Sequence, residues 1–263
     1  MQPLQGKTVI ITRAQGQQSE SSRLFIAAGA NTLELPSLVV GPPKDWKPLD
    51  SALSNLESFS WIIFSSSNGV NYVEARLRNI GKTLSDFSNT LKIAVVGKKT
   101  ASVLREIGVG VDFIPSNFIA DSLVSDFPEY SNGLKILIPR VQSGGRTLLA
   151  ESFINKGCNV SEVAAYETSC PASIPEKTLV ALRNSLVDAI VFTSAKTAKY
   201  SSVLLEKHFG EKWLNYMEEV RLISIGPQTT LSCLNYFKRV DLEATKHDLD
   251  GLLEVYIQSL LDK

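Results

Sequence analysis

Hydroxyl side chains stand where short apolar segments give way to helical sequence. Ser65 and Ser66 follow one apolar segment, and Thr193 and Ser194 follow another. Such side chains cap helices, and the free backbone N–H groups of a helix's first turn bind anions with help from the helix dipole. Capping alone explains any single junction. Because the two junctions occupy equivalent places in the two halves of the chain, they favour a ligand surface at the carboxyl ends of strands.

Two threonines and two arginines recur in the same way. Thr100 and Thr229 each follow a glycine at the end of a β-rich segment, and Arg13 and Arg140 each stand at a strand end. A guanidinium in that place can hold a carboxylate through two parallel hydrogen bonds. A structural ion pair is the alternative for both arginines. These four residues join the junction hydroxyls as candidates for binding an anionic ligand.

The glycine-containing turns do not match nucleotide sites. Residues 97–100, Gly-Lys-Lys-Thr, are similar to the end of a P-loop, but Lys92 stands where that motif requires glycine. Residues 108–110 close a helix, whereas the dinucleotide fingerprint opens one. The turn at residues 144–146 suits either a phosphate or a tight turn alone. A nucleotide-dependent enzyme is therefore disfavoured, and a nucleotide that raised the melting temperature would revive it.

The sequence offers few residues for catalysis by histidine or cysteine or for binding a metal ion. His208 and His247 both stand among charged helical residues, where a solvated surface position is expected. Cys158, Cys170 and Cys233 are far apart and lack a Cys-x-x-Cys spacing, which favours free, buried thiols. We expect no metal site and no disulfide.

Composition restricts the classes of partner. The 27 basic and 27 acidic residues balance, so a general attraction to nucleic acid or anionic lipid is not expected. No apolar run approaches the roughly 20 residues of a membrane span, and the N-terminus lacks the pattern of a secretory signal. We expect a cytoplasmic protein that binds neither nucleic acid nor membrane.

The elements that position the candidate residues alternate between strand and helix. Strands are expected at residues 8–12, 61–64, 93–96, 136–138, 160–166, 189–192 and 221–225. Helices between them end near Gly29, Gly108 and Gly157, and the last helix repeats apolar residues at three-and-four spacing from Leu249 to Leu260. This alternation predicts an α/β fold with parallel sheets flanked by helices.

The chain also contains an internal duplication. Residues 9–15 reappear as 136–142, residues 64–66 as 192–194, and residues 96–101 as 225–230, at a nearly constant offset. The duplication predicts two related domains, and a crevice between domains is the default place for a ligand.

Proline-rich stretches at residues 36–48 and 169–175 predict where the chain crosses between domains. Domain one then comprises residues 1–36 and 171–263, and domain two residues 43–164. The linkers are residues 37–42 and 165–170.

In order along the chain, these motifs resemble those of uroporphyrinogen-III synthases. The resemblance lies in Ile-Thr-Arg at 11–13, Phe-Ser-Ser-Ser-Asn-Gly-Val at 64–70, Val-Gly-x-x-Thr-Ala at 96–101, Tyr-Glu-Thr at 166–168, Phe-Thr-Ser at 192–194 and Ile-Gly-Pro-Gln-Thr at 225–229. It covers nearly the whole chain. Ser65 stands where Thr is common in such proteins, and Ala195 where Pro is frequent; neither change removes a group that we assign to chemistry.

The resemblance implies two α/β domains joined by a two-stranded linker, with the first strand and helix belonging to the domain that holds the C-terminal part. It implies a cofactor-free, cyclising hydro-lyase of tetrapyrrole biosynthesis. Its substrate would be hydroxymethylbilane, a linear polycarboxylate tetrapyrrole, closed to uroporphyrinogen III through a spirocyclic intermediate that inverts the last pyrrole ring. We expect the protein to act as a monomer.

Tyr166, at the expected linker, is the best-placed proton donor for the departing hydroxyl, with aromatic packing under the linker as the alternative. The expected substrate-binding residues are Arg13, Ser65, Ser66, Thr100, Arg140, Thr193, Ser194 and Thr229. A non-catalytic two-domain binding or sensor protein is the second hypothesis, because fold does not fix function. Such a protein would protect hydroxymethylbilane from cyclising.

Overall fold

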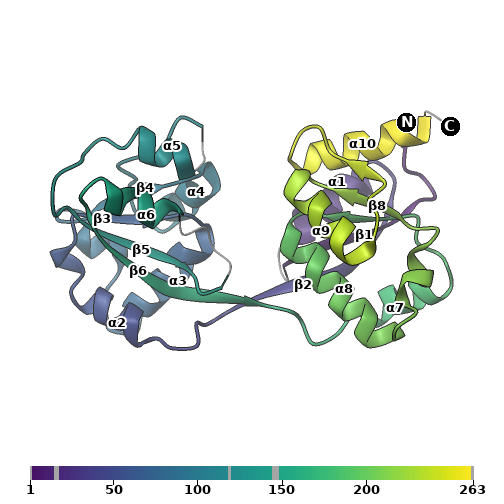
Figure 1. Cartoon of the computed structure of the whole chain (residues 1–263), viewed down its shortest axis with the longest axis horizontal. Coiled ribbons are helices and arrows are strands. Elements are labelled where there is room, and N and C mark those ends of the chain that lie inside the picture. Colours follow the sequence, from purple (N-terminus) through teal and green to yellow (C-terminus); the bar gives the residue numbers. More distant parts are fainter. Residues whose placement is uncertain (1, 15–17, 118–119, 144–147, 262–263) are drawn as a thin grey trace. The chain divides into compact units, whose positions relative to one another are not determined.

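The computed structural model describes residues 2–14, 18–117, 120–143 and 148–261. It divides into two compact units (Figure 1). Unit 1 combines Met1–Val39 with Ser169–Lys263, and unit 2 is Val40–Thr168. The side chain of Arg13 and the turn at residues 144–146, both considered above, lie outside the residues described.

Unit 1 is built on a parallel sheet in the order β2-β1-β7-β8-β9. Its strands are β1 (Thr8–Ala14), β2 (Asn31–Gly41), β7 (Ala189–Phe192), β8 (Arg221–Ser224) and β9 (Leu242–Glu243). Its helices are α1 (Gln18–Ala27), α7 (Glu176–Arg183), α8 (Ala195–Phe209), α9 (Pro227–Phe237) and α10 (Leu249–Leu261). Successive strand residues point to opposite faces, so Val9 packs with α1 and α10 whereas Ile10 packs with α7, α8 and α9.

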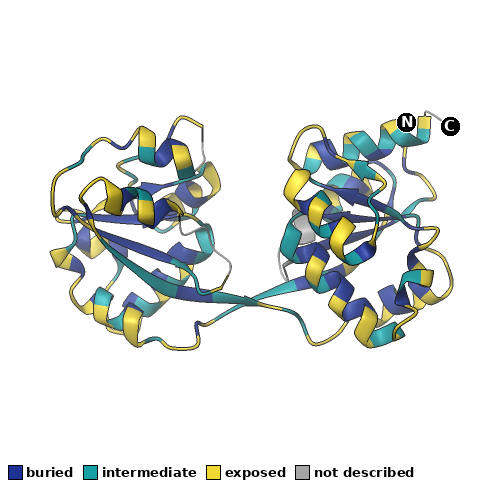
Figure 2. Ribbon diagram, in the orientation of Figure 1, coloured by how far each residue is buried: buried dark blue, intermediate teal, exposed yellow. Residues whose placement is uncertain are grey.

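Unit 2 repeats this plan with a parallel sheet in the order β4-β3-β5-β6. Its strands are β3 (Trp61–Phe64), β4 (Lys92–Val95), β5 (Lys135–Val141) and β6 (Asn159–Ser169). Its α-helices are α2 (Lys47–Ser54), α3 (Ser67–Arg78), α4 (Lys98–Glu106), α5 (Ala120–Ser125) and α6 (Leu148–Asn155). The central strands of both units are buried on both faces (Figure 2), which is why their sequences read as continuous apolar runs.

The structure confirms the internal duplication. Strand β5 lies 127 residues after β1, β7 lies 128 after β3, and β8 lies 129 after β4. The β1–β2 and β5–β6 pairs each carry a bulge at the same place, after Arg13 and after Arg140. Each unit combines strands of both repeats. In unit 1, β1 and β2 of the first repeat join β7 and β8 of the second, whereas in unit 2, β5 and β6 of the second repeat join β3 and β4 of the first.

Strand β2 was missed because its proline was interpreted as the start of a connector. Pro36 instead lies within β2, opposite Arg13, and the register shifts at the next pair. A proline lacks the N–H that a sheet ladder needs and is tolerated at a bulge, which is where this one lies. Strand β9 was also missed, the other strands were placed within a few residues, and β3 and β7 begin and end where the sequence predicted.

Gly29, Gly108 and Gly157, the predicted helix ends, all have positive φ. Among the described residues, no helix has the length and apolar character needed to cross a membrane.

Replacing Gly251 by Ala should destabilise unit 1. Gly251 is buried in the first turn of α10, and a Cβ there would overlap the carbonyl oxygen of Lys246. Relief requires the backbone to shift, at a cost of about 1–3 kcal/mol. Urea unfolding measures the loss. Gly110→Ala is the matched control, because a Cβ at Gly110 meets nothing within 4 Å; equal stability of the two variants would contradict the overlap.

Candidate functional site

In unit 2 the junction after β3 forms as its hydroxyls predicted. Ser66 has extended backbone angles, begins α3 as its N-cap, and accepts a hydrogen bond from the Gly69 N–H at 3.2 Å. This bond satisfies one of the unpaired N–H groups of the first turn. Ser65, one residue earlier, is exposed. The remaining first-turn donors and the positive end of the helix dipole lie at the carboxyl end of the strand.

Tyr166 lies at the same edge of unit 2, near the end of β6. Its side chain is only 7% exposed, and its hydroxyl lies 2.9 Å from the Ser66 hydroxyl. The ring of Tyr72, on α3, stacks on the Tyr166 ring with centroids 6.0 Å apart and planes at 19°. Helix α3 therefore fixes the phenol twice, at its oxygen through Ser66 and at its face through Tyr72.

Burial sets the protonation state of this phenol. It raises the pKa of Tyr166 above the ordinary value of 10.0, while the hydrogen bond with Ser66 acts in the opposite direction and is the smaller effect. Tyr166 therefore keeps its proton through the neutral range. A protonated, oriented phenol is a group that can donate a proton to a departing oxygen.

The arginine candidates have different surroundings. Arg140 forms the structural ion pair that was the alternative, with its Nε 3.1 Å from a Glu162 carboxylate oxygen. Both side chains are about one quarter exposed, at 24% each, so solvent still reaches the pair. Arg13 pairs through its backbone with Pro36 in the β1–β2 ladder.

In unit 1 the equivalent junction is also capped. Ser194 is the N-cap of α8, and its hydroxyl accepts a hydrogen bond from the Thr197 N–H at 3.2 Å. In turn, the Thr197 hydroxyl accepts a hydrogen bond from the Ser194 N–H. Thr193 donates to the carbonyl of Thr12 at 2.9 Å, which joins the junction to the neighbouring strand β1. The two hydroxyls therefore have separate partners within unit 1, one on β1 and one in the first turn of α8.

Thr100 and Thr229 are more buried than the other described candidates. They are 4% and 3% exposed, inside the first turns of α4 and α9, and the N-caps of those helices are Gly97 and Gly226. The threonine hydroxyls are therefore in buried residues, and Pro227, the first residue of α9, has no backbone N–H.

Two residues near these edges were missed or misplaced. Tyr72 was missed because no local pattern links it to Tyr166, which is far away in the sequence. His247 was expected in a helix but lies in the loop between β9 and α10, where its ring packs so closely on Gly226 that a Cβ there would meet it at 2.9 Å.

Other groups give little chemistry. His208 accepts a hydrogen bond from the Ile174 N–H at 3.3 Å on the surface of α8. The three thiols are free, and burial raises the pKa of Cys233 to about 12. Within the described ranges, no cluster of three or more His, Cys, Asp or Glu side chains is arranged to hold a metal ion.

Replacing Ser66 by Ala should cost about 0.5–2 kcal/mol of unfolding free energy, because a helix cap is lost. Ser65→Ala is the control, since Ser65 is exposed and the cap belongs to its neighbour. Thermal unfolding of both variants measures the difference. A Ser66 variant as stable as the Ser65 variant would mean that the cap contributes nothing.

Two α/β units that share one duplicated plan, with capped strand-to-helix junctions at the carboxyl ends of their strands, define a duplicated two-unit α/β protein. The sequence profile described as "Uroporphyrinogen-III synthase HemD" matches residues 19–254. A uroporphyrinogen-III synthase of Synechococcus elongatus is 44% identical over 252 residues, covering 96% of this chain and 95% of the relative. The chain belongs to the uroporphyrinogen-III synthase family.

Solved structures agree in fold. A mutant uroporphyrinogen III synthase from the extremely thermophilic bacterium Thermus thermophilus matches with a TM-score of 0.62 at 16% identity, covering 97% of this chain and 100% of that one. The uroporphyrinogen-III synthetase of Helicobacter pylori 26695 matches with a TM-score of 0.61 at 17% identity, over 98% and 100% of the two chains. At such identities the likeness concerns the fold, and it covers both units.

Proposed function

We propose that this chain converts hydroxymethylbilane into uroporphyrinogen III, as a cyclising lyase that needs no cofactor. Family membership supports the reaction. The single structural observation that carries the proposal is the buried Tyr166 phenol, held at 2.9 Å from the Ser66 hydroxyl at the carboxyl edge of a sheet. It supplies an oriented acid where the family's reaction has to remove a hydroxyl group.

The chemistry assigns one proton to Tyr166. The phenol protonates the terminal hydroxyl of the substrate, water leaves, and the pyrrole nitrogen's electrons form the azafulvenium cation. Its N–H proton returns to the phenolate, which gives the neutral azafulvene and restores Tyr166. The substituted carbon of the last ring then attacks the azafulvene carbon to give the spirocyclic intermediate, and fragmentation with recombination closes the macrocycle with that ring inverted. Orientation contributes as much as acid catalysis, because the attacking carbon is already substituted and must be held in place.

We propose that backbone N–H groups, rather than a basic surface, bind the carboxylates of the substrate. The chain is neutral, with 27 basic and 27 acidic residues, whereas the substrate is a polycarboxylate. The capped junctions of α3 and α8 and the glycine-capped starts of α4 and α9 supply backbone N–H groups for these carboxylates. The proposed binding residues are Arg13, Ser65, Ser66, Thr100, Arg140, Thr193, Ser194 and Thr229, with Arg140 giving up part of its pairing with Glu162.

The proposal includes a monomer that acts in the cytoplasm on a small molecule and not on nucleic acid. Sedimentation should therefore give a mass near 28.8 kDa.

The test of the reaction is incubation with freshly prepared hydroxymethylbilane, followed by separation of the type I and type III isomers. We expect the type III isomer in excess. Product of type I alone, formed at the rate seen without protein, would contradict the proposal. A chain that instead slows cyclisation by sequestering the substrate would establish the alternative, a non-catalytic binding protein.

A further inference from the structure

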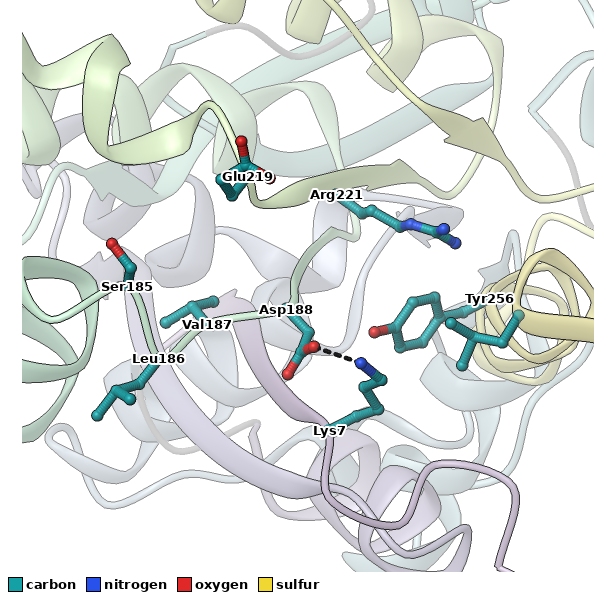
Figure 3. Close-up of a pocket in the computed structure, with 9 residues that line it drawn as sticks. Lys7, Ser185, Leu186, Val187, Asp188, Glu219, Arg221 and Tyr256 are labelled. Atoms are coloured by element: carbon teal, nitrogen blue, oxygen red, sulfur yellow. Dashed lines mark hydrogen bonds and ion pairs between the residues drawn. The ribbon is translucent and has the colours of Figure 1, made fainter. Parts of the chain in front are cut away.

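A pocket of about 470 Å³ opens at the amino ends of β1, β7 and β8 in unit 1 (Figure 3). This is the edge of the sheet opposite to the junctions described above. Its polar lining includes Lys7, Asp188, Glu219, Arg221 and Tyr256, and its apolar lining includes Val187 and Leu260. Neither the proposed reaction nor the duplication of the fold assigns a role to this pocket.

The pocket lining carries two basic and two acidic side chains, and among the described residues Arg221 is the basic one without a close carboxylate. One Asp188 oxygen accepts from Lys7 at 2.7 Å, and the other accepts from the Thr8 N–H at 2.8 Å, so this carboxylate is occupied. Arg221 donates only to the backbone oxygen and hydroxyl of Ser259. Within the part of the chain that the structure describes, no carboxylate lies within ion-pair distance of Arg221.

Tyr256 adds a donor that faces the pocket. Its side chain is 1% exposed, yet its hydroxyl forms no hydrogen bond with any described residue. In Figure 3 that hydroxyl points from α10 toward the Lys7–Asp188 pair. Burial raises the pKa of Tyr256 to about 12, and the Asp188 charge adds to the rise, so the phenol is protonated and able to donate. The hydroxyl faces the pocket, where it is available to an acceptor on a ligand.

The duplication supplies an internal comparison in unit 2. Lys92 opens β4 as Arg221 opens β8, and each pairs across the sheet with the first residue of its neighbouring strand, Trp61 or Ala189. The Lys92 ammonium lies 2.8 Å from a Glu129 carboxylate oxygen, which also accepts from the Trp61 indole at 3.3 Å. At the amino ends of β3 and β4 in unit 2, the Glu129 carboxylate thus contacts both the Lys92 ammonium and the Trp61 indole.

Among its described residues, unit 1 has no such pairing of a carboxylate with an indole at this edge, and Glu219, which lines the pocket, is not within ion-pair distance of Arg221. Ala189 stands in place of the Trp61 indole. Tyr256, which follows Arg221 by the same 35 residues that separate Phe127 from Lys92, brings a hydroxyl where the packed Phe127 ring has none. The pocket opens beside a guanidinium that, among the described residues, lacks the close carboxylate that its counterpart in unit 2 has.

We propose that this pocket of unit 1 binds a small carboxylic acid with a short apolar body. The ligand carboxylate would pair with Arg221 as the Glu129 carboxylate pairs with Lys92, and accept a hydrogen bond from Tyr256. The apolar body would contact Val187 and Leu260. The proposal does not rest on the proposed reaction, because it concerns the opposite edge of the sheet.

The test uses the full chain and benzoate as the probe, with isothermal titration calorimetry as the measurement. We expect saturable binding with a Kd on the order of 1 mM. Arg221→Gln should weaken it at least about tenfold, because a charge-assisted pair is lost, and Tyr256→Phe about fivefold. Lys92→Gln, at the equivalent position of unit 2, should leave the affinity unchanged.

Several results would overturn this assignment. They are the absence of saturable binding up to about 10 mM benzoate, an affinity shared by all variants, and inorganic phosphate binding as tightly as benzoate. Tyr256→Phe keeps the ring and so keeps the test valid if Arg221→Gln fails to fold, which melting temperatures check. Tyr166→Phe should bind benzoate normally, so that failure here and failure of the proposed reaction are told apart.

Discussion

Tyr166→Phe should form uroporphyrinogen III about 10²-fold more slowly than the unaltered chain. The substitution removes the proton donor and its bond to Ser66, while the ring keeps its stacking on Tyr72. General acid help is typically worth about 10²–10⁴-fold, and water or a substrate carboxyl takes part of the role, so the lower end applies. The measurement is the ratio of type III to type I isomer at limiting enzyme, because unassisted closure gives type I.

Melting temperature is the first control for Tyr166→Phe, and Tyr216→Phe, at a phenol that is 40% exposed, is the matched variant. An unaltered rate would remove the proton-donor role. Low activity together with a lowered melting temperature would support the packing role instead.

The same phenol predicts a pH dependence. Since burial raises the pKa of Tyr166 above its ordinary value of 10.0, the acid form persists through the neutral range, and activity that depends on it falls only on the alkaline side. The Phe variant should lack that alkaline fall at equal substrate saturation.

Trp61→Ala should destabilise unit 2 by about 3–5 kcal/mol, the usual cost of removing a large ring from a core. Trp61 is 2% exposed, packs against Phe127 with ring centroids 4.7 Å apart, and donates to Glu129. The loss therefore combines a cavity with an unmade hydrogen bond. Urea unfolding followed by circular dichroism measures it.

Trp46→Ala is the matched control for this substitution, because Trp46 is only partly buried and borders the core from outside. We expect it to cost clearly less. If both tryptophan variants lost the same stability, burial of Trp61 would not be what holds this edge of the sheet.

The sequence allowed much of the fold to be predicted where the signal was local. Strands such as β3 and β7 consist of four consecutive buried residues, so their apolar runs marked their ends. The near-constant offsets of the duplication revealed two related units. Strand β2 was hidden because Pro36 at a bulge looks like a chain breaker, and the two-residue strand β9 carries too little pattern to be seen.

In the candidate site, too, the local contacts could be predicted from the sequence and the long-range contacts could not. Ser66 and Ser194 were found because capping depends on residues three positions apart. The contact between Ser66 and Tyr166 joins residues 100 positions apart, and the Tyr72 stacking depends on how α3 packs beside β6. Such contacts arise from tertiary packing, which no short window of sequence contains. The pairing of Arg140 with Glu162 is likewise a property of neighbouring strands.

The interrupted path of the chain through unit 1 has a consequence for biosynthesis. Unit 2 is continuous from Val40 to Thr168, so it can fold once that segment leaves the ribosome. Strand β1 must wait for β7, whose residues begin to pair with it at Ala189. At about 5–20 residues per second, the 24 residues from Ser169 to Phe192 take about 1–5 s to appear. During that interval β1 can pair with β2 but lacks β7 on its other side, so we expect this apolar strand edge to be exposed to chaperones.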